Sequence, residues 1–354
     1  MKKFWFTEAQ EPRSYMSNRK VESNQHAFNQ ELNEYKTIFS CNFPEYLKAP
    51  TGPERLLKDF NCSVDKCRFT TDPVHVPKAD LVIFYERYVR LNYTRPPNQI
   101  YAIFHLESPF HTARMPYPDV FNWTITYRYD STIPSPYSKW MYFHPDVKQK
   151  EQLHNYAANK TKMVAWFVSN CNDKNGRLKY AHDLQEHVGV DIYGSCGNLT
   201  CLRENEDQCF DMLDKDYKFY LAFENSNCKE YITEKLFRNA LQHNVLPIVM
   251  GAPPKDYEKY APQRSYIHVD DFESPMKLAE YLHELNGNDD MYNAYFQWKG
   301  TGEFAKLNHL CDACAMLHTG EIISTPKSFE DVNKWWNAPG ICTRHSWRNV
   351  NSQN

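Results

Sequence analysis

The sequence predicts an α/β protein with two doubly wound domains, and three observations support this prediction. The chain has 354 residues, which is more than one average domain. Short runs of β-branched and aromatic residues recur and are separated by helical or loop segments, as in parallel sheets. Hydrophobic residues make up 42% of the chain, so there is enough apolar surface to form cores and disorder is excluded.

The first α/β region follows a polar, weakly periodic stretch over residues 1–33, which we expect to be a stem or peripheral segment. The elements expected after it are a strand over Thr37–Ser40, a helix over Pro53–Phe60, and strands over Asp80–Tyr85 and Ile100–Glu107. The stretch Tyr137–Lys160 is polar and shows no strand pattern, so we expect it to link two domains.

The second α/β region shows the strand, loop and helix alternation more clearly. The elements expected here are strands over Met163–Val168, Val190–Tyr193, Tyr217–Phe223, Val245–Met250 and Ser265–Val269, with helices over Arg177–His187 and Thr233–His243. The predicted division is residues 34–155 for the first domain, 160–300 for the second, and 301–354 for a C-terminal segment. In a doubly wound domain, ligands bind beyond the carboxyl ends of the strands.

Composition excludes some classes of protein. The net charge is −3 with no long basic run, which disfavours a nucleic-acid binder. No run approaches the 18 or so apolar residues of a membrane span, and Met1–Gln10 lacks the core of a signal peptide. Eleven cysteines, together with Asn-x-Ser/Thr sequons at five asparagines, favour a secretory lumen over the cytosol. Membrane attachment is therefore expected only through an N-terminal anchor outside this sequence.

The window Tyr217–Leu241 (YKFYLAFENSNCKEYITEKLFRNAL) contains the clearest candidate ligand site. A polar loop over Glu224–Glu230 leads from a strand into a helix whose apolar residues share one face, which leaves Glu234 and Lys235 off that face in the first turn. A helix start beyond a strand end suits a diphosphate, Lys235 adds a full positive charge, and Glu234 can accept two ribose hydroxyls. A capped surface helix is the alternative interpretation.

This window resembles the donor-binding signature of the α1,3-fucosyltransferases, glycosyltransferase family 10. The resemblance extends over roughly residues 60–350, with LESP at 106–109, WFVSN at 166–170 and VLPIVMG at 245–251. The blocks SNC at 169–171, WKGTGEF at 298–304 and PGICTRHSWRN at 339–349 are closest to invertebrate and plant enzymes that fucosylate the innermost GlcNAc of N-glycans. The resemblance implies a GT-B-like fold, in which two Rossmann-like domains face each other across a cleft. The first domain would bind the acceptor and the second would bind GDP-fucose.

Glu107 is the candidate general base. It closes an apolar strand before Ser-Pro, so its carboxylate is expected at the carboxyl end of a strand. By resemblance, Glu107 takes the proton from the GlcNAc 3-hydroxyl while that oxygen attacks the anomeric carbon of GDP-β-L-fucose. A single displacement inverts that centre. A cap or a surface charge is the alternative for Glu107 taken alone.

The departing GDP needs positive charge, and the resemblance assigns this catalytic role to Arg177 and Lys235. The other residues that it places around GDP-fucose are Tyr137, Ser169, Asn225, Tyr231 and Glu234. For Arg177 alone, a solvated arginine at a helix start is the alternative. A charge role for Arg128 stays open, because related enzymes carry a second basic residue where this chain has Tyr129.

No metal site and no required cofactor are expected. Neither Asp270-Asp271 nor Asp289-Asp290 is flanked like the DxD dyad that holds a metal in other transferases. The two cations would replace the metal, so a divalent ion such as Mn²⁺ is expected at most to stimulate.

Four cysteines could form either a zinc site or two disulfides. Cys62 and Cys67 with Cys311 and Cys314 offer four thiolates, but two disulfides are expected in an oxidising lumen, and the resemblance agrees. Such bridges would return residues 301–354 to the first domain. Among the others, Cys171 and Cys228 are expected to be able to pair, whereas no partner is assigned to Cys41, Cys196, Cys201, Cys209 and Cys342.

The resemblance therefore implies an inverting transferase that moves L-fucose from GDP-β-L-fucose to the 3-hydroxyl of the Asn-linked GlcNAc of N-glycans. It would work on glycoproteins in the Golgi lumen, as the lumenal part of a type II membrane protein. One rival is a Lewis-type α1,3/4-fucosyltransferase acting on antennary N-acetyllactosamine. A rival of another class is a catalytically dead glycan-binding protein, although such a protein need not keep Glu107, Arg177, Glu234 and Lys235 together.

Overall fold

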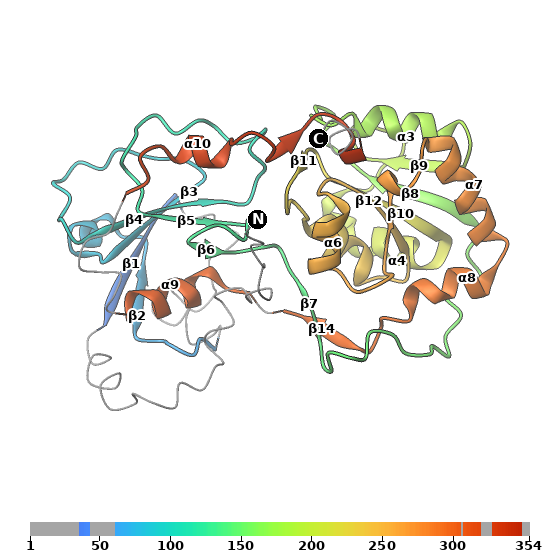
Figure 1. The fold of residues 1–354 in the computed structure, drawn as a ribbon, viewed down its shortest axis with the longest axis horizontal. Helices are drawn as coiled ribbons and strands as arrows, with labels where there is room; N and C mark the ends of the chain where they lie inside the picture. Colours follow the sequence, from blue (N-terminus) through green and yellow to red (C-terminus); the bar gives the residue numbers. More distant parts are fainter. Residues whose placement is uncertain (1–34, 43–60, 306, 320–327, 349–354) are drawn as a thin grey trace, which may run out of the picture. The chain divides into compact units, whose positions relative to one another are not determined.

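The computed structural model describes residues 35–42, 61–305, 307–319 and 328–348 (Figure 1). The stem expected over 1–33 and the helix expected over Pro53–Phe60 lie outside these residues. The chain divides into two compact units. Unit 1 holds the described residues up to Glu107, then His111–Ser135 and those of Leu307–Ala338, and unit 2 holds the other described residues. None of the helices in the described ranges is both long enough and apolar enough to cross a membrane.

Unit 1 contains a parallel six-stranded sheet in the order β2-β1-β3-β4-β5-β6. Its strands are β1 (Lys36–Cys41), β2 (Cys67–Thr70), β3 (Leu81–Tyr85), β4 (Ile100–His105), β5 (Trp123–Thr126) and β6 (Ile133–Pro134). Its helices are η3 (Pro73–Lys78), α9 (His309–Leu317) and α10 (Val332–Trp336). Successive strand residues face opposite sides of a sheet, so Ile83 packs in one core with Leu310 of α9, and Phe84 packs in the other with Val332 of α10.

Unit 2 contains a parallel five-stranded sheet in the order β13-β12-β10-β8-β9. Its strands are β8 (Lys162–Phe167), β9 (Val190–Tyr193), β10 (Tyr217–Phe223), β12 (Leu246–Met250) and β13 (Ile267–His268). Its helices are α3 (Arg177–Gln185), η4 (Arg203–Asn205), α4 (Glu206–Asp216), α5 (Glu234–Leu236), η5 (Phe237–Leu241), α6 (Pro254–Tyr260), η6 (Val269–Asp271), α7 (Pro275–Asn286), α8 (Asp289–Asn293) and η7 (Ala294–Phe296).

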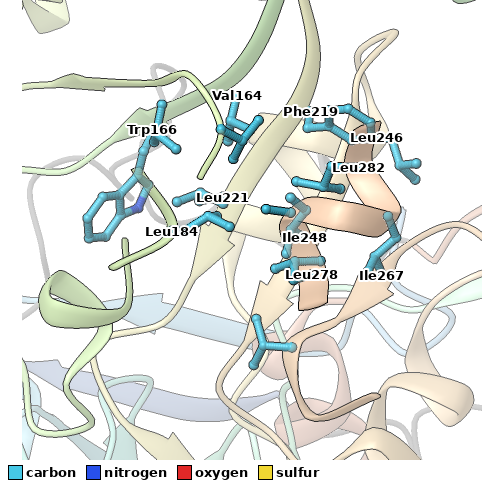
Figure 2. Close-up of a cluster of buried hydrophobic side chains, with 14 of the residues drawn as sticks. Val164, Trp166, Leu184, Phe219, Leu221, Leu246, Ile248, Ile267, Leu278 and Leu282 are labelled. Carbon is cyan, nitrogen blue, oxygen red and sulfur yellow. The ribbon is translucent and has the colours of Figure 1, made fainter. Parts of the chain in front are cut away.

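The core of unit 2 lies on both faces of this sheet. On one face, Val164, Leu221 and Ile248 of the strands pack with Leu184 of α3 and with α7 (Figure 2). On the other face, alternate strand residues pack with α4, η5 and α6. Every residue of β10 is buried, which explains its uninterrupted apolar and aromatic run.

Most expected elements of the second region are confirmed, with two differences. The helix expected over Thr233–His243 starts as α5 and continues as the π-helical η5. The stretch Tyr137–Lys160, expected to lack strands, contains β7 (Trp140–Tyr142), which pairs antiparallel with β14 (Gly302–Phe304). Three-residue strands are too short to show alternation in a sequence. Residues 136–155, expected in the first domain, belong to unit 2.

The C-terminal segment is shared between the two units. Residues of Leu307–Ala338 return to unit 1, whereas the segment Pro339–Arg348, which we call the strap, belongs to unit 2. Within the strap, β15 (Cys342–Thr343) pairs antiparallel with β11 (Asn227–Cys228). The strap therefore binds to the loop between β10 and α5.

Five disulfides account for ten of the eleven cysteines. Two of them, Cys62–Cys311 and Cys67–Cys314, confirm the expected bridges to the first domain. His318 lies near Cys67 and Cys314, but these sulfurs are bonded to each other and His318 contacts the Lys66 carbonyl. The remaining bridges are Cys171–Cys196, Cys201–Cys209 and Cys228–Cys342.

The expected pairing of Cys171 with Cys228 is wrong. Cys228 is instead bonded to Cys342 of the strap, which is 114 positions away along the chain. Cys171 is bonded to Cys196, beyond β9. Cys41 is the free thiol; it is buried, and burial raises its pKa, which makes it a poor nucleophile.

Candidate active site

Two strand ends in unit 2 lie where the order of the sheet reverses. β8 and β10 are neighbours, but the chain continues from β8 to β9 on one side and from β10 to β12 on the other. Ligands of doubly wound sheets bind beyond the carboxyl ends of such a pair of strands. Ser169 follows β8, and Glu224 and Asn225 follow β10. This edge is therefore the candidate nucleotide site.

Arg177, the first residue of α3, joins these two strand ends. Only 3% of the residue is exposed, and its guanidinium donates to the carbonyls of Phe223 at 2.7 Å and Asn170 at 2.8 Å. Burial lowers the pKa of Arg177, and Glu224 opposes this shift. Its Nε atom has no hydrogen-bond partner among the described residues. Arg177 is thus a buried cation at the switch point, and not a solvated arginine.

A carboxylate and a lysine meet at the start of α5. Glu224 accepts the Thr233 backbone N–H at 2.8 Å and the Thr233 hydroxyl at 2.9 Å. The Nζ atom of Lys235 lies 3.0 Å from Glu224 Oε2 and 3.0 Å from Glu234 Oε1. Burial acts to lower the pKa of Lys235, but the two carboxylates outweigh burial and raise it. Lys235 is therefore firmly protonated.

The two carboxyl groups around Lys235 differ in their surroundings. Burial raises the pKa of Glu224, and the neighbouring Lys235 opposes this shift. For Glu234, burial acts in the same direction, but the charge and the hydrogen bond of Lys235 prevail and lower its pKa. The side chain of Glu234 is half-exposed, whereas that of Glu224 is almost fully buried. Of the two, Glu234 is the one that can reach a ligand.

The other expected donor-binding residues belong to the same unit. Asn225 is 7% exposed, and its side-chain oxygen accepts from the Ser226 hydroxyl at 3.0 Å. Tyr231, at the end of the loop, is buried, and Tyr137 is partly buried against the core that contains η5. Ser169 is exposed just beyond β8. Arg177, Asn225, Glu234 and Lys235 thus belong to the segments that meet at the end of β10, and Ser169 lies just beyond the end of the neighbouring strand β8.

Glu107 belongs to unit 1 and lies just beyond the last residue of β4, as expected for a strand-end carboxylate. It is half-buried. The following residue, Ser108, belongs to unit 2, where its hydroxyl donates to Ser226 Oγ at 2.8 Å. The residue after the candidate base is therefore tied to the loop that carries Asn225.

Arg128, whose charge role the sequence leaves open, makes structural contacts in unit 1. Its buried guanidinium forms an ion pair with Asp130, donates to the Trp335 carbonyl at 3.1 Å and lies 4.4 Å from the Trp335 ring. These contacts hold α10 against the sheet. Tyr129 is 41% exposed.

Three features of the site were not predicted. Glu224 directly follows β10, and its position after a fully buried strand was the one available signal. Gly251 follows β12 at φ +155°, and a Cβ there would lie 2.6 Å from Glu224 Cγ, so glycine is required next to this carboxylate. The contact of the strap with the loop between β10 and α5 could not be predicted, because the two segments are far apart in the sequence.

Two parallel doubly wound units, one with a buried arginine and a partly buried lysine at its switch point, define a GT-B transferase fold of the kind that uses nucleotide sugars. The sequence patterns of two family regions match this chain: fucosyltransferase, N-terminal, over residues 32–138, and glycosyltransferase family 10 (fucosyltransferase), C-terminal, over residues 157–335. The chain belongs to glycosyltransferase family 10, the fucosyltransferases.

Relatives and a solved structure agree. A glycoprotein 3-alpha-L-fucosyltransferase A of Drosophila melanogaster is 54% identical over 320 residues, which cover 90% of this chain and 63% of the relative. An alpha-(1,3)-fucosyltransferase C of the same organism is 34% identical, with 80% of this chain and 72% of the relative covered. A crystal structure of an α1,3-fucosyltransferase with GDP-fucose has the same fold, with a TM-score of 0.55 at 18% identity over 81% of this chain and 91% of that one. The chain thus spans less than two thirds of the length of the first relative.

Proposed function

We propose that this chain transfers L-fucose from GDP-β-L-fucose to the 3-hydroxyl of the innermost GlcNAc of N-glycans on glycoproteins, with inversion. The observation that carries the proposal is the presence of two cations, the buried Arg177 and the partly buried Lys235, at the switch point of a family 10 fold. The 54% identity to a glycoprotein 3-alpha-L-fucosyltransferase supports a glycoprotein acceptor.

The donor half of the mechanism follows from unit 2. Arg177 and Lys235 would hold the diphosphate and neutralise the charge that develops as GDP leaves, since fixed cations in a site of low dielectric stabilise such charge strongly. Glu234 would accept the ribose hydroxyls, because it is the accessible carboxylate at the start of α5. Tyr137, Ser169, Asn225 and Tyr231 would complete the contacts to the nucleotide and the fucose.

The acceptor half uses Glu107 as the general base. Its carboxylate would take the proton of the GlcNAc 3-hydroxyl as that oxygen forms a bond to the anomeric carbon and the bond from this carbon to the GDP oxygen breaks. Only one carboxylate is needed, because GDP leaves as a stable anion and requires no acid. The displacement from the opposite face converts the β-linked donor into an α-fucoside.

We propose further that no metal or other cofactor is required. The two cations occupy the role that a divalent ion plays in other transferases, so Mn²⁺ would at most stimulate. The aspartates that could be taken for metal ligands make contacts within the protein. Asp270 accepts hydrogen bonds from the Ser346 hydroxyl and the Trp347 backbone N–H. Asp289 pairs with Lys218 and accepts from Asn155.

The proposed location is the Golgi lumen. Five disulfides suit an oxidising secretory compartment and not the cytosol.

The test is incubation of the purified chain with GDP-fucose and a panel of N-glycopeptides, with free N-acetyllactosamine as the second acceptor, followed by mass spectrometry. We expect one fucose on the innermost GlcNAc, and retention of activity after EDTA treatment. Transfer only to N-acetyllactosamine would favour a Lewis-type enzyme, and glycan binding without transfer would favour a dead transferase. Complete loss of activity on treatment with EDTA, reversed by added Mn²⁺, would overturn the metal-free mechanism.

A further inference from the structure

Glu224 is the most buried carboxylate in the described part of the chain, and the proposed mechanism gives it no task. Only 1% of the residue is exposed. A buried charge is costly unless it is paired and hydrogen-bonded, so its presence beside the donor site needs an explanation.

Both oxygens of Glu224 are used by the first residues of α5. Oε1 accepts the Thr233 N–H at 2.8 Å, and Oε2 accepts the Thr233 hydroxyl at 2.9 Å and lies 3.0 Å from Lys235 Nζ. The Thr233 hydroxyl also lies 2.9 Å from Lys235 Nζ. These contacts fix the ammonium from two sides and connect the end of β10 to the start of α5.

We propose that Glu224 is a positioning residue for the diphosphate of the donor, because it fixes the place and the charge of Lys235. The inference rests on the donor-binding role proposed above for Lys235. Glutamine at this position could still accept the Thr233 N–H, but it could not neutralise the ammonium. The carboxylate is therefore needed for its charge as well as for its hydrogen bonds.

Few other groups near Lys235 can change charge in the range of an assay. Glu234, beside it on α5, has a lowered pKa because Lys235 outweighs its burial. Burial raises the pKa of Tyr220 on β10 to about 12, and that of Tyr257 on α6 still further, so both phenols stay neutral. Arg177 on α3 stays charged. A difference between Glu224→Gln and wild type in the alkaline behaviour of GDP binding therefore reports on Lys235.

The experiment compares Glu224→Gln with wild type by calorimetry of GDP binding between pH 6 and pH 10. We expect wild type to keep its GDP affinity up to pH 10, because the pKa of Lys235 is raised. Removal of an opposite charge at this distance lowers a pKa by about one to three units, so Glu224→Gln should begin to lose GDP affinity at the alkaline end of this range. The matched control is Asp256→Asn. Asp256 is also buried and accepts the Glu230 N–H of the same loop at 2.7 Å, but it pairs with Lys259 and not with Lys235. Its pH profile should equal that of wild type.

A Lys235→Ala variant separates the two proposals. Unchanged GDP affinity in Lys235→Ala would remove the donor role of Lys235. Weakened binding in Lys235→Ala, with a wild-type pH profile in Glu224→Gln, would remove the positioning role of Glu224 alone. If Glu224 were purely structural, Glu224→Gln would lower the melting temperature without changing the loss of GDP affinity at alkaline pH.

If Glu224→Gln does not fold, the proposal is tested by the pH at which Lys235 loses its proton in the wild-type protein. Competitive acetylation at increasing pH, with Lys235→Arg to identify the modified peptide, should show that Lys235 becomes reactive above the pKa of about 10.4 of ordinary lysines. Reactivity of Lys235 at or below that pH would overturn the proposal.

Discussion

Arg177 is a buried cation of unit 2 and Lys235 a partly buried one, and their charges are balanced differently. Arg177 donates to two backbone carbonyls, which carry only partial charges, whereas Lys235 lies between two carboxylates. Glu224 is buried and Glu234 is half-exposed. We therefore expect Glu234 to give up its ion pair with Lys235 when a ligand binds, whereas the ion pair between Glu224 and Lys235 stays. Arg177 would then supply a constant positive field at the strand ends.

Replacement of Glu107 by Gln tests the general base at the residue scale. The variant should fold and bind GDP as wild type does, because the residues proposed to bind GDP belong to unit 2 and Glu107 belongs to unit 1. Turnover should fall by roughly 10²–10⁴-fold, the usual loss when a general base is removed. Steady-state assays and GDP calorimetry measure the two effects.

The control for this variant is Glu86→Gln. Glu86 is a half-exposed carboxylate of unit 1 that faces His105, and it has no place in the proposed mechanism. Its activity should stay near wild type. Wild-type turnover in Glu107→Gln would exclude Glu107 as the base.

At the scale of elements, the strap determines how the loop between β10 and α5 is held. The strap is bonded to Cys228, its His345 carbonyl accepts from Asn227 at 3.1 Å, and its Ile341 carbonyl accepts from the Lys229 N–H at 2.8 Å. Its far end is anchored by Trp347, which is 5% exposed and donates to the Gly251 carbonyl at 2.9 Å. The loop that carries Asn225 is therefore held by the strap at Asn227, Cys228 and Lys229.

Removal of the Trp347 side chain should loosen both the strap and this loop. Truncation of a buried tryptophan costs about 3–5 kcal/mol of stability, although the Cys228–Cys342 bond keeps the strap tethered. We expect a lower melting temperature and faster hydrogen exchange over residues 224–231, measured by mass spectrometry. Arg348→Ala is the control, because Arg348 is exposed and donates to a single carbonyl. Unchanged exchange over 224–231 in Trp347→Ala would show that the strap does not order the loop.

For the whole molecule, two neighbouring bridges hold the C-terminal segment to unit 1. Cys62–Cys311 and Cys67–Cys314 span 249 and 247 positions, and they bring α9 onto the sheet core. Because the two bridges close nearly the same loop, their entropic contributions are not additive. With one bridge in place, the other closes only a short ring.

Serine variants of these cysteines should show that the contributions of the two bridges to stability are not additive. The pair Cys67→Ser and Cys314→Ser should lose roughly 2–3 kcal/mol, whereas replacement of all four cysteines should also lose the long-loop contribution of about 5 kcal/mol. Thermal unfolding and secreted yield measure the difference, and the four-serine chain should aggregate. Equal losses from the pair and from the four would contradict the shared loop, and stoichiometric zinc in wild-type protein would contradict the bridges themselves.

The sequence alone determined the class of the fold, the five strands of the unit 2 sheet, the helices that begin at Arg177 and near Thr233, and the placement of Glu234 and Lys235 at the start of α5. These features depend on local spacing, because a buried parallel strand and an apolar helix face leave a pattern within a few residues. Only the tertiary structure decided the partner of Cys228, the burial of Arg177 between two strand ends, the structural role of Arg128 and the contact of Glu224 with Lys235. Each of these depends on residues brought together by the order of the strands or by the return of the C-terminal segment, which no local pattern records.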